Sequence, residues 1–195
     1  MAKYNKLNMG QKEAVVNIIG GMERVKMLLG GELLVLSLAE LIVWRTVVIR
    51  KGTDYWRELY GPTKHTGEAY KMTQNIPTVQ EDRVVDLVLL ALEDMGFSNP
   101  NSSYGYGEIC DKAKLLGFHL CPQEVGAHFS TKVQTFCPRK MFYVSSKPLT
   151  NGCNQASIYT VHDDGKDITV GSIPTKNARF KSKDLFVFER RLSNG

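Results

Sequence analysis

Three cysteines and two histidines that could bind a metal or take part in catalysis lie close together near the middle of the chain. They are Cys110, His119, Cys121, His128 and Cys137, spaced as C-x8-H-x-C-x6-H-x8-C. Zinc accepts thiolate and imidazole ligands, but its structural sites use pairs of ligands a few residues apart. Since this spacing fits no zinc knuckle or finger, we predict no metal site, and no cofactor motif is present.

The same residues suggest a nucleophilic site. Cys121 directly precedes a predicted helix that begins at Pro122, and a helix N-terminus lowers the pKa of a nearby thiol. His119 or His128 would then act as the base. The alternative is a cysteine that only occupies the cap position of that helix. The chain has no G-x-S-x-G, H-E-x-x-H or D-x-D-x-D-G motif, so a non-enzymatic role is favoured over a Cys121/His enzyme.

The predicted helix 122–133 also favours nucleic-acid binding. Its polar residues would face a major groove as in a recognition helix, while basic residues after it would contact phosphates. Residues 129–195 hold eleven Lys/Arg against five Asp/Glu, a net charge of +6, which suits a polyanionic partner. A solvated helix face would offer the same residues. The proposed contacts are Gln123, His128, Ser130, Thr131 and Lys132 on the helix, and Arg139, Lys140 and Lys147 after it.

Aromatic residues in two polar segments suggest a further alternative, a surface for a ligand or another protein. Tyrosine, tryptophan and arginine are typical anchors of protein interfaces, although such rings also pack beneath loops. The residues are Tyr55, Trp56, Arg57, Tyr60 and His65 in the first segment, and Tyr104 and Tyr106 in the second. We therefore keep a protein–protein interaction module as an alternative.

The first part of the chain, residues 1–76, is predicted to be helical with one or two strands. Gln11–Ile19 and Met22–Leu29 have helical spacing of apolar residues, and each is followed by a glycine pair that ends a helix. Ile42–Arg50 is rich in β-branched residues and is predicted to be a strand. A polar segment then leads to a domain boundary near Pro77.

The second part, residues 77–195, is predicted to contain three helices followed by strands. The helices are Val84–Met95, Tyr106–Leu116 and Pro122–Val133, and the strands are Met141–Ser145, Ser157–Val161, Ile168–Ile173 and Leu185–Glu189. Glycines end the first two helices, and Asn-Gly and Asp-Gly dipeptides separate the strands. The predicted fold is therefore α+β: an N-terminal helical part, then a three-helix unit and a small antiparallel sheet, in the order of a winged helix.

Three sequence blocks carry a resemblance to a group of uncharacterised proteins from candidate-phyla bacteria of the Parcubacteria type. They are I-I-G-G-M-E-R-V-K-M-L-L-G-G-E-L at residues 18–33, W-R-T-V at residues 44–47, and the long block at residues 86–126 that contains Y-G-E-I-C-D-K-A-K-L-L-G-F-H-L-C-P-Q-E-V-G. The resemblance implies neither an activity nor any catalytic residue.

The cysteine pattern and hydropathy bear on the cellular compartment. The four cysteines include no C-x-x-C pair, and residues 1–11 are polar, so we expect free thiols and no signal peptide. The most apolar run, Leu33–Ile49, contains Glu40 and Arg45, and it is shorter than the roughly 20 apolar residues of a spanning helix. We predict a cytoplasmic protein that does not enter the membrane; the sequence does not predict an oligomeric state.

Overall fold

The chain divides into two units, Met1–Ser37 and Leu38–Gly195. The computed structural model describes residues 43–55, 64–131, 140–164 and 167–190, without the side chains of residues 64, 130, 131 and 140. All of these residues belong to the second unit, and the predicted helices before residue 42 lie outside them.

A single mixed sheet organises the described part of the chain. Its main path runs β1-β3-β9-β5-β7-β8-β2, with β4 paired to β9 and β6 paired to β7. Most neighbouring strands are antiparallel, but β5 with β9 and β2 with β8 are parallel. The strands are β1 (Arg45–Ile49), β2 (Lys64–His65), β3 (Arg83–Ala91), β4 (Phe118–His119), β5 (Lys140–Val144), β6 (Leu149–Thr150), β7 (Ala156–Asp163), β8 (Ile168–Pro174) and β9 (Leu185–Arg190).

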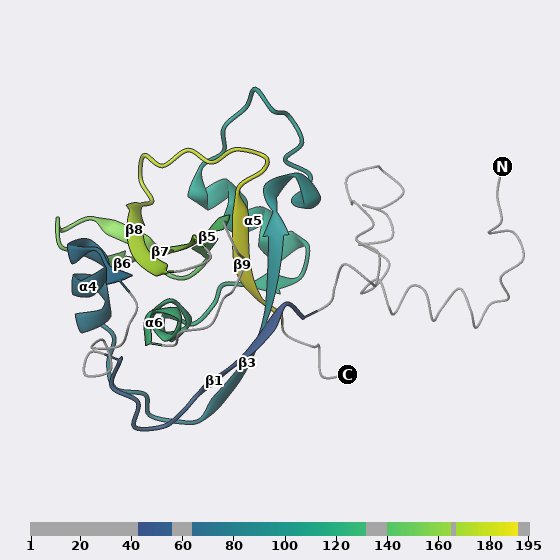
Figure 1. Cartoon of the computed structure of the whole chain (residues 1–195). Helices are drawn as coiled ribbons and strands as arrows, with labels where there is room; N and C mark the ends of the chain where they lie inside the picture. Colours follow the sequence, from purple (N-terminus) through teal and green to yellow (C-terminus); the bar gives the residue numbers. More distant parts are fainter. Residues whose placement is uncertain (1–42, 56–63, 132–139, 165–166, 191–195) are drawn as a thin grey trace, which may run out of the picture. The chain divides into compact units, whose positions relative to one another are not determined.

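Helix α6 (Gln123–Thr131) lies inside the curl of this sheet (Figure 1). It contacts β1 as well as β7 and β8, although β1 and β8 lie far apart in the strand order. A sheet can reach the same helix from both of these positions only if it curls, and the sheet is a half-barrel. Phe129 of α6 packs against both Trp44 and Phe142, with ring centroids 6.0 and 5.5 Å away.

The opposite face of the sheet carries a second apolar layer, rich in aromatic rings. Phe186 and Phe188 of β9 lie opposite Leu90 and Val88 of β3, and directly opposed residues in an antiparallel pair share a face. Helix α5 (Tyr106–Leu115) also contributes buried residues, among them Ile109. The sheet is therefore buried on both faces along β3 and β9.

The predicted fold class is wrong, because the described chain is strand-rich rather than a three-helix unit with a small sheet. The largest error is at Val84–Met95, which was predicted to be a helix. Residues 83–91 form strand β3, and only Leu92–Met95 form a short 3-10 helix, η2, which ends at Gly96 with a φ of 95°. The predicted winged-helix order is therefore also wrong, because the first of the three predicted helices is mostly the strand β3.

The physical reason for this error is the double burial of β3. A strand buried on both faces reads as a continuous apolar run, and hydrophobic periodicity alone cannot distinguish such a run from a buried helix segment. In β3, Val85 and Leu87 face the α6 core while Val88 and Leu90 face the aromatic layer. The glycine after Met95 ends a 3-10 turn just as well as an α-helix.

Other local predictions are confirmed. The second and third predicted helices correspond to α5 and α6, and the four predicted strands after residue 140 correspond to β5, β7, β8 and β9. The predicted strand at Ile42–Arg50 contains β1.

Helix α4 (Gly67–Gln74) was not predicted; Thr66 caps it by accepting the Ala69 N–H. β1 pairs with β3 across the boundary predicted near Pro77.

None of the helices in the described ranges combines the length and the apolar character needed to cross a membrane.

Candidate functional site

The described part of α6 is mostly buried. Val125, Gly126, Ala127 and Phe129 are buried, and Gln123, Glu124 and His128 are half-buried. The Gln123 side chain donates to the Lys147 backbone carbonyl at 3.0 Å. Between residues 123 and 129, α6 therefore presents no fully exposed side chain to a nucleic-acid groove.

The remaining residues of that predicted interface are only partly described. The side chains of Thr131 and Lys140 are not described, Lys132 and Arg139 lie outside the described residues, and Lys147 is exposed after β5. Groove recognition by helix 122–133 stays a prediction, and it would depend on the residues from 130 onward.

Cys121 lies in an environment unlike that of a catalytic thiol. Its side chain is 3% exposed, and Sγ donates to the Val187 carbonyl at 3.5 Å. Burial, and after it the nearby Glu189 carboxylate, raises the pKa of the Cys121 thiol, whereas a nucleophile needs a lowered pKa. His119 is exposed on β4, and the His128 ring packs edge-on against Tyr55, with ring centroids 6.4 Å apart.

No three His, Cys, Asp or Glu residues in the described ranges come together as a metal site requires. Cys137 lies outside these ranges. Cys110 is buried on α5, and burial raises its thiol pKa.

The aromatic residues proposed as interface anchors separate into two environments. Tyr55 is buried and Tyr106 donates from within the core to the Ser146 carbonyl at 2.6 Å, so both are structural. Tyr104 is half-buried and lies at the surface. Trp56, Arg57 and Tyr60 lie outside the described residues, and His65 is half-buried on β2.

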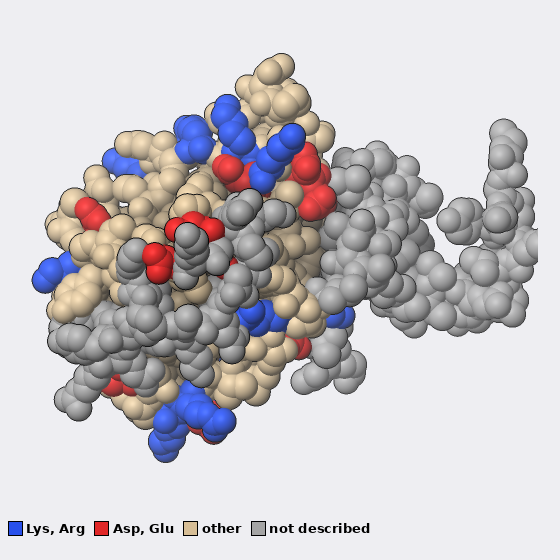
Figure 2. All heavy atoms as spheres, in the orientation of Figure 1, with Lys and Arg blue, Asp and Glu red and all other residues tan. Residues whose placement is uncertain are grey.

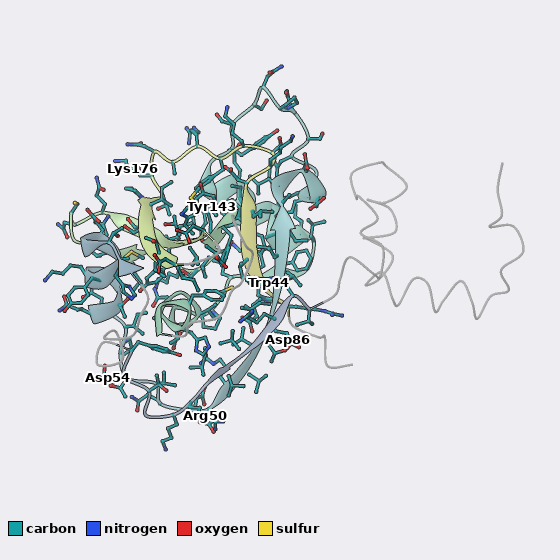
Figure 3. All side chains as sticks on the ribbon, viewed as in Figure 1. Trp44, Arg50, Asp54, Asp86, Tyr143 and Lys176 are labelled. Atoms are coloured by element: carbon teal, nitrogen blue, oxygen red, sulfur yellow. The ribbon has the colours of Figure 1, made fainter. Side chains whose placement is uncertain are left out.

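The connection between β8 and β9, residues 175–184, is rich in cations, and we call it the basic loop. It holds four exposed cationic side chains and one carboxylate, Asp184. Figure 2 shows Lys and Arg side chains gathered along the upper edge of this view, where the loop runs in Figure 1, with some carboxylates beside them. Lys176 projects outward from the loop in Figure 3. The four are Lys176, Arg179, Lys181 and Lys183.

Hydrogen bonds hold both ends of the basic loop. The Thr175 N–H donates to the Ala156 carbonyl at 2.9 Å. Near the other end, the Asp184 carboxylate accepts the Lys181 N–H at 2.8 Å, and the Ser182 carbonyl accepts the Glu93 N–H at 2.7 Å. The loop is thus tied both to β7 and to η2.

Phe180 anchors the middle of the basic loop. Its side chain is fully buried, with its ring 4.9 Å from Tyr143 and 5.0 Å from Phe186 between centroids. Burial, and then Asp184, raises the pKa of Tyr143 to about 12, so this ring stays neutral at physiological pH. Phe180 also pairs with Tyr104, each backbone N–H donating to the other residue's carbonyl at 2.9 and 3.0 Å.

The sequence predicts a basic C-terminal part, but the phosphate contacts predicted there are Arg139, Lys140 and Lys147. The signal for the basic loop was present in K-N-A-R-F-K-S-K, residues 176–183, where one aromatic residue stands among four cations. What the sequence lacked was any sign that Phe180 is an anchor buried against β5 and β9.

No protein-family model, curated protein or solved structure matches this chain.

Proposed function

We propose that the described part of this protein is a nucleic-acid-binding module that contacts phosphates through the basic loop. The observation that supports this most is the presence of four exposed cations on one anchored loop. Within the described residues no ion pair engages Lys176, Arg179, Lys181 or Lys183. A cation that is not held in an ion pair keeps its full charge available for an external polyanion.

The anchoring of the loop adds to the expected affinity. A flexible loop loses conformational entropy when it binds, so a loop that is already ordered binds at a lower cost. Here the single carboxylate of the loop, Asp184, accepts a backbone N–H from within the loop. It therefore has a structural role and is directed to the backbone of the loop.

The number of cations sets the expected salt dependence. Each phosphate that a cation neutralises releases counterions, so log K falls linearly with log salt, with a slope of about −0.7 per contact for single strands. Four contacts predict a slope of roughly −3, which makes binding roughly 50-fold weaker when the salt concentration rises fourfold.

Fluorescence anisotropy of a labelled oligonucleotide, titrated at several salt concentrations, tests this function. Changing Lys181→Gln or Lys183→Gln should reduce the magnitude of the slope by about 0.7 each. Lys71→Gln on α4 is a matched control, since Lys71 is also exposed, and it should leave the slope unchanged. Absence of binding at low salt would refute the function.

The same assay distinguishes the two surfaces. Lys147→Gln removes the exposed cation of the interface predicted from the sequence. If Lys147→Gln reduces the magnitude of the slope while the basic-loop variants do not, the nucleic acid contacts the surface beside α6 rather than the basic loop.

A second candidate function is a protein-interaction module, favoured by an exposed apolar pair at the end of the strand order. Val48 of β1 and Val84 of β3 lie directly opposite each other and are 43% and 67% exposed. Light scattering on purified protein tests this candidate through self-association. A concentration-dependent dimer that Val84→Lys dissociates would support it, and a monomer at all concentrations would argue against self-association.

A further inference from the structure

The Tyr104 ring is held beside the basic loop with part of its surface exposed. Its backbone is paired to Phe180 in both directions, and its hydroxyl donates to the Asn99 carbonyl at 3.3 Å. The Phe97 ring packs against it, with centroids 4.5 Å apart. Three independent contacts therefore fix the orientation of a half-buried aromatic ring at the surface.

The segment that is paired with Tyr104 carries cations. Arg179 and Lys181 are the residues on either side of Phe180, the backbone partner of Tyr104. The guanidinium of Arg179 reaches the residue after the tyrosine: Nη1 lies 3.4 Å from the position that a Cβ on Gly105 would occupy. A cation thus lies against the residue that follows the tyrosine, across the bridge between the two segments.

Paired residues of an antiparallel bridge share a face, so the Tyr104 ring lies on the same side as Phe180, at the rim of the aromatic layer. Arg179 and Lys181 project to the other side, because side chains alternate along an extended segment. An extended polymer that crosses this rim could place a flat group on the Tyr104 ring and a neighbouring anionic group on the cations. Single-stranded nucleic acid is such a polymer, with a flat base and a phosphate in every unit.

We propose that Tyr104 and the basic loop together bind single-stranded nucleic acid, with one base stacked on the Tyr104 ring and adjacent phosphates on Arg179 and Lys181. This inference rests on the proposed function and narrows its ligand. In a duplex the bases are already stacked and paired, so the ring has no base face to contact. In an unpaired strand every base offers a face, and stacking on an aromatic side chain strengthens binding.

Three labelled probes with similar charge test the proposal: an oligothymidylate of about 15 nucleotides, an abasic oligomer with the same number of phosphates, and a duplex. We expect the oligothymidylate to bind at least about 5-fold more tightly than the abasic oligomer, which is the smallest effect expected from one stacked base. The duplex should show no such advantage over the abasic oligomer.

Two substitutions locate the effect. Tyr104→Leu should weaken oligothymidylate binding about 5-fold or more and leave abasic binding unchanged. Tyr104→Phe keeps the ring and loses only the hydroxyl contact to Asn99, so it should bind like the unaltered protein. A circular dichroism spectrum that matches the unaltered protein shows that each variant is folded.

The three probes distinguish a loss of base stacking from a loss of phosphate binding. If oligothymidylate, abasic oligomer and duplex bind alike and Tyr104→Leu has no effect, stacking is refuted while phosphate binding by the loop stands. If none of the three probes binds at low salt, the proposed function itself is refuted. Equally tight binding of polyglutamate would overturn the assignment to nucleic acid, since it has no bases.

Discussion

Replacing Gly126 by alanine tests the packing of α6 inside the curled sheet. A Cβ built on Gly126 would lie 2.6 Å from Cγ and 2.7 Å from Cε2 of the Tyr159 ring, and closer still to Cδ2. Ordinary carbon contacts are about 3.5–4 Å. The ring and the helix would therefore have to separate by more than about 1 Å to reach ordinary contact, which weakens their remaining contacts.

The ring has little freedom to move away. Tyr159 is fully buried on β7, and its hydroxyl lies 3.0 Å from Thr73 Oγ1. Thr73 itself donates to the Ala69 carbonyl, so the tyrosine is the donor in this pair. Overpacking costs typically about 1–3 kcal/mol, and we expect the upper end here. Higher helix propensity returns up to about 1 kcal/mol, which leaves Gly126→Ala about 2 kcal/mol less stable.

Urea unfolding followed by circular dichroism and by tryptophan fluorescence measures this change. Gly107→Ala on α5 is the matched control, because Gly107 is exposed with no atom within 4 Å of its added Cβ. It should be as stable as the unaltered protein or more stable by up to about 1 kcal/mol. The effect of Gly126→Ala should also shrink when Tyr159→Leu removes the ring. A Gly126→Ala protein that unfolds at the same urea concentration as the unaltered protein would refute this packing.

Three further outcomes are expected from the same structure. Burial raises the pKa of Tyr159 above its ordinary value of 10. The stability that the neutral hydroxyl contributes is therefore complete below pH 10 and is lost as the pH rises above 10. Tyr159→Phe should reduce this alkaline loss, measured by urea unfolding, by about 1.4 kcal/mol per pH unit. Cys153 is exposed and Cys121 is buried. After brief maleimide treatment, mass spectrometry should therefore find the label on Cys153 and not on Cys121. Equal labelling of the two cysteines would show that the Cys121 thiol is not buried. Asn151 Oδ1 accepts the N–H groups of Cys153 and Gln155 at 2.9 Å each, so Asn151→Ala should lower the free energy of unfolding by about 1–3 kcal/mol, and an unchanged urea midpoint would show that these two bonds do not stabilise the loop.

The sequence by itself determined the local structures that a short segment specifies. Helix α5 has a helical apolar stripe and a glycine stop, and β7 and β8 have the β-branched residues of strands. The basic character of the C-terminal part was also visible, because charge is a property of composition. These features depend on neighbours in the chain, so a linear pattern records them.

Tertiary structure decided the state of β3 and the exposure of α6. The apolar run of β3 suits a helix or a strand, and pairing with β1 and β9 selects the strand. The polar residues of α6 suggested an exposed recognition face, but the sheet curls around this helix and contacts it from β1 as well as from β7 and β8. The candidate site depends on structure for the same reason. Phe180 meets Tyr104 from a distant part of the chain, and only that contact places an aromatic ring beside the basic loop.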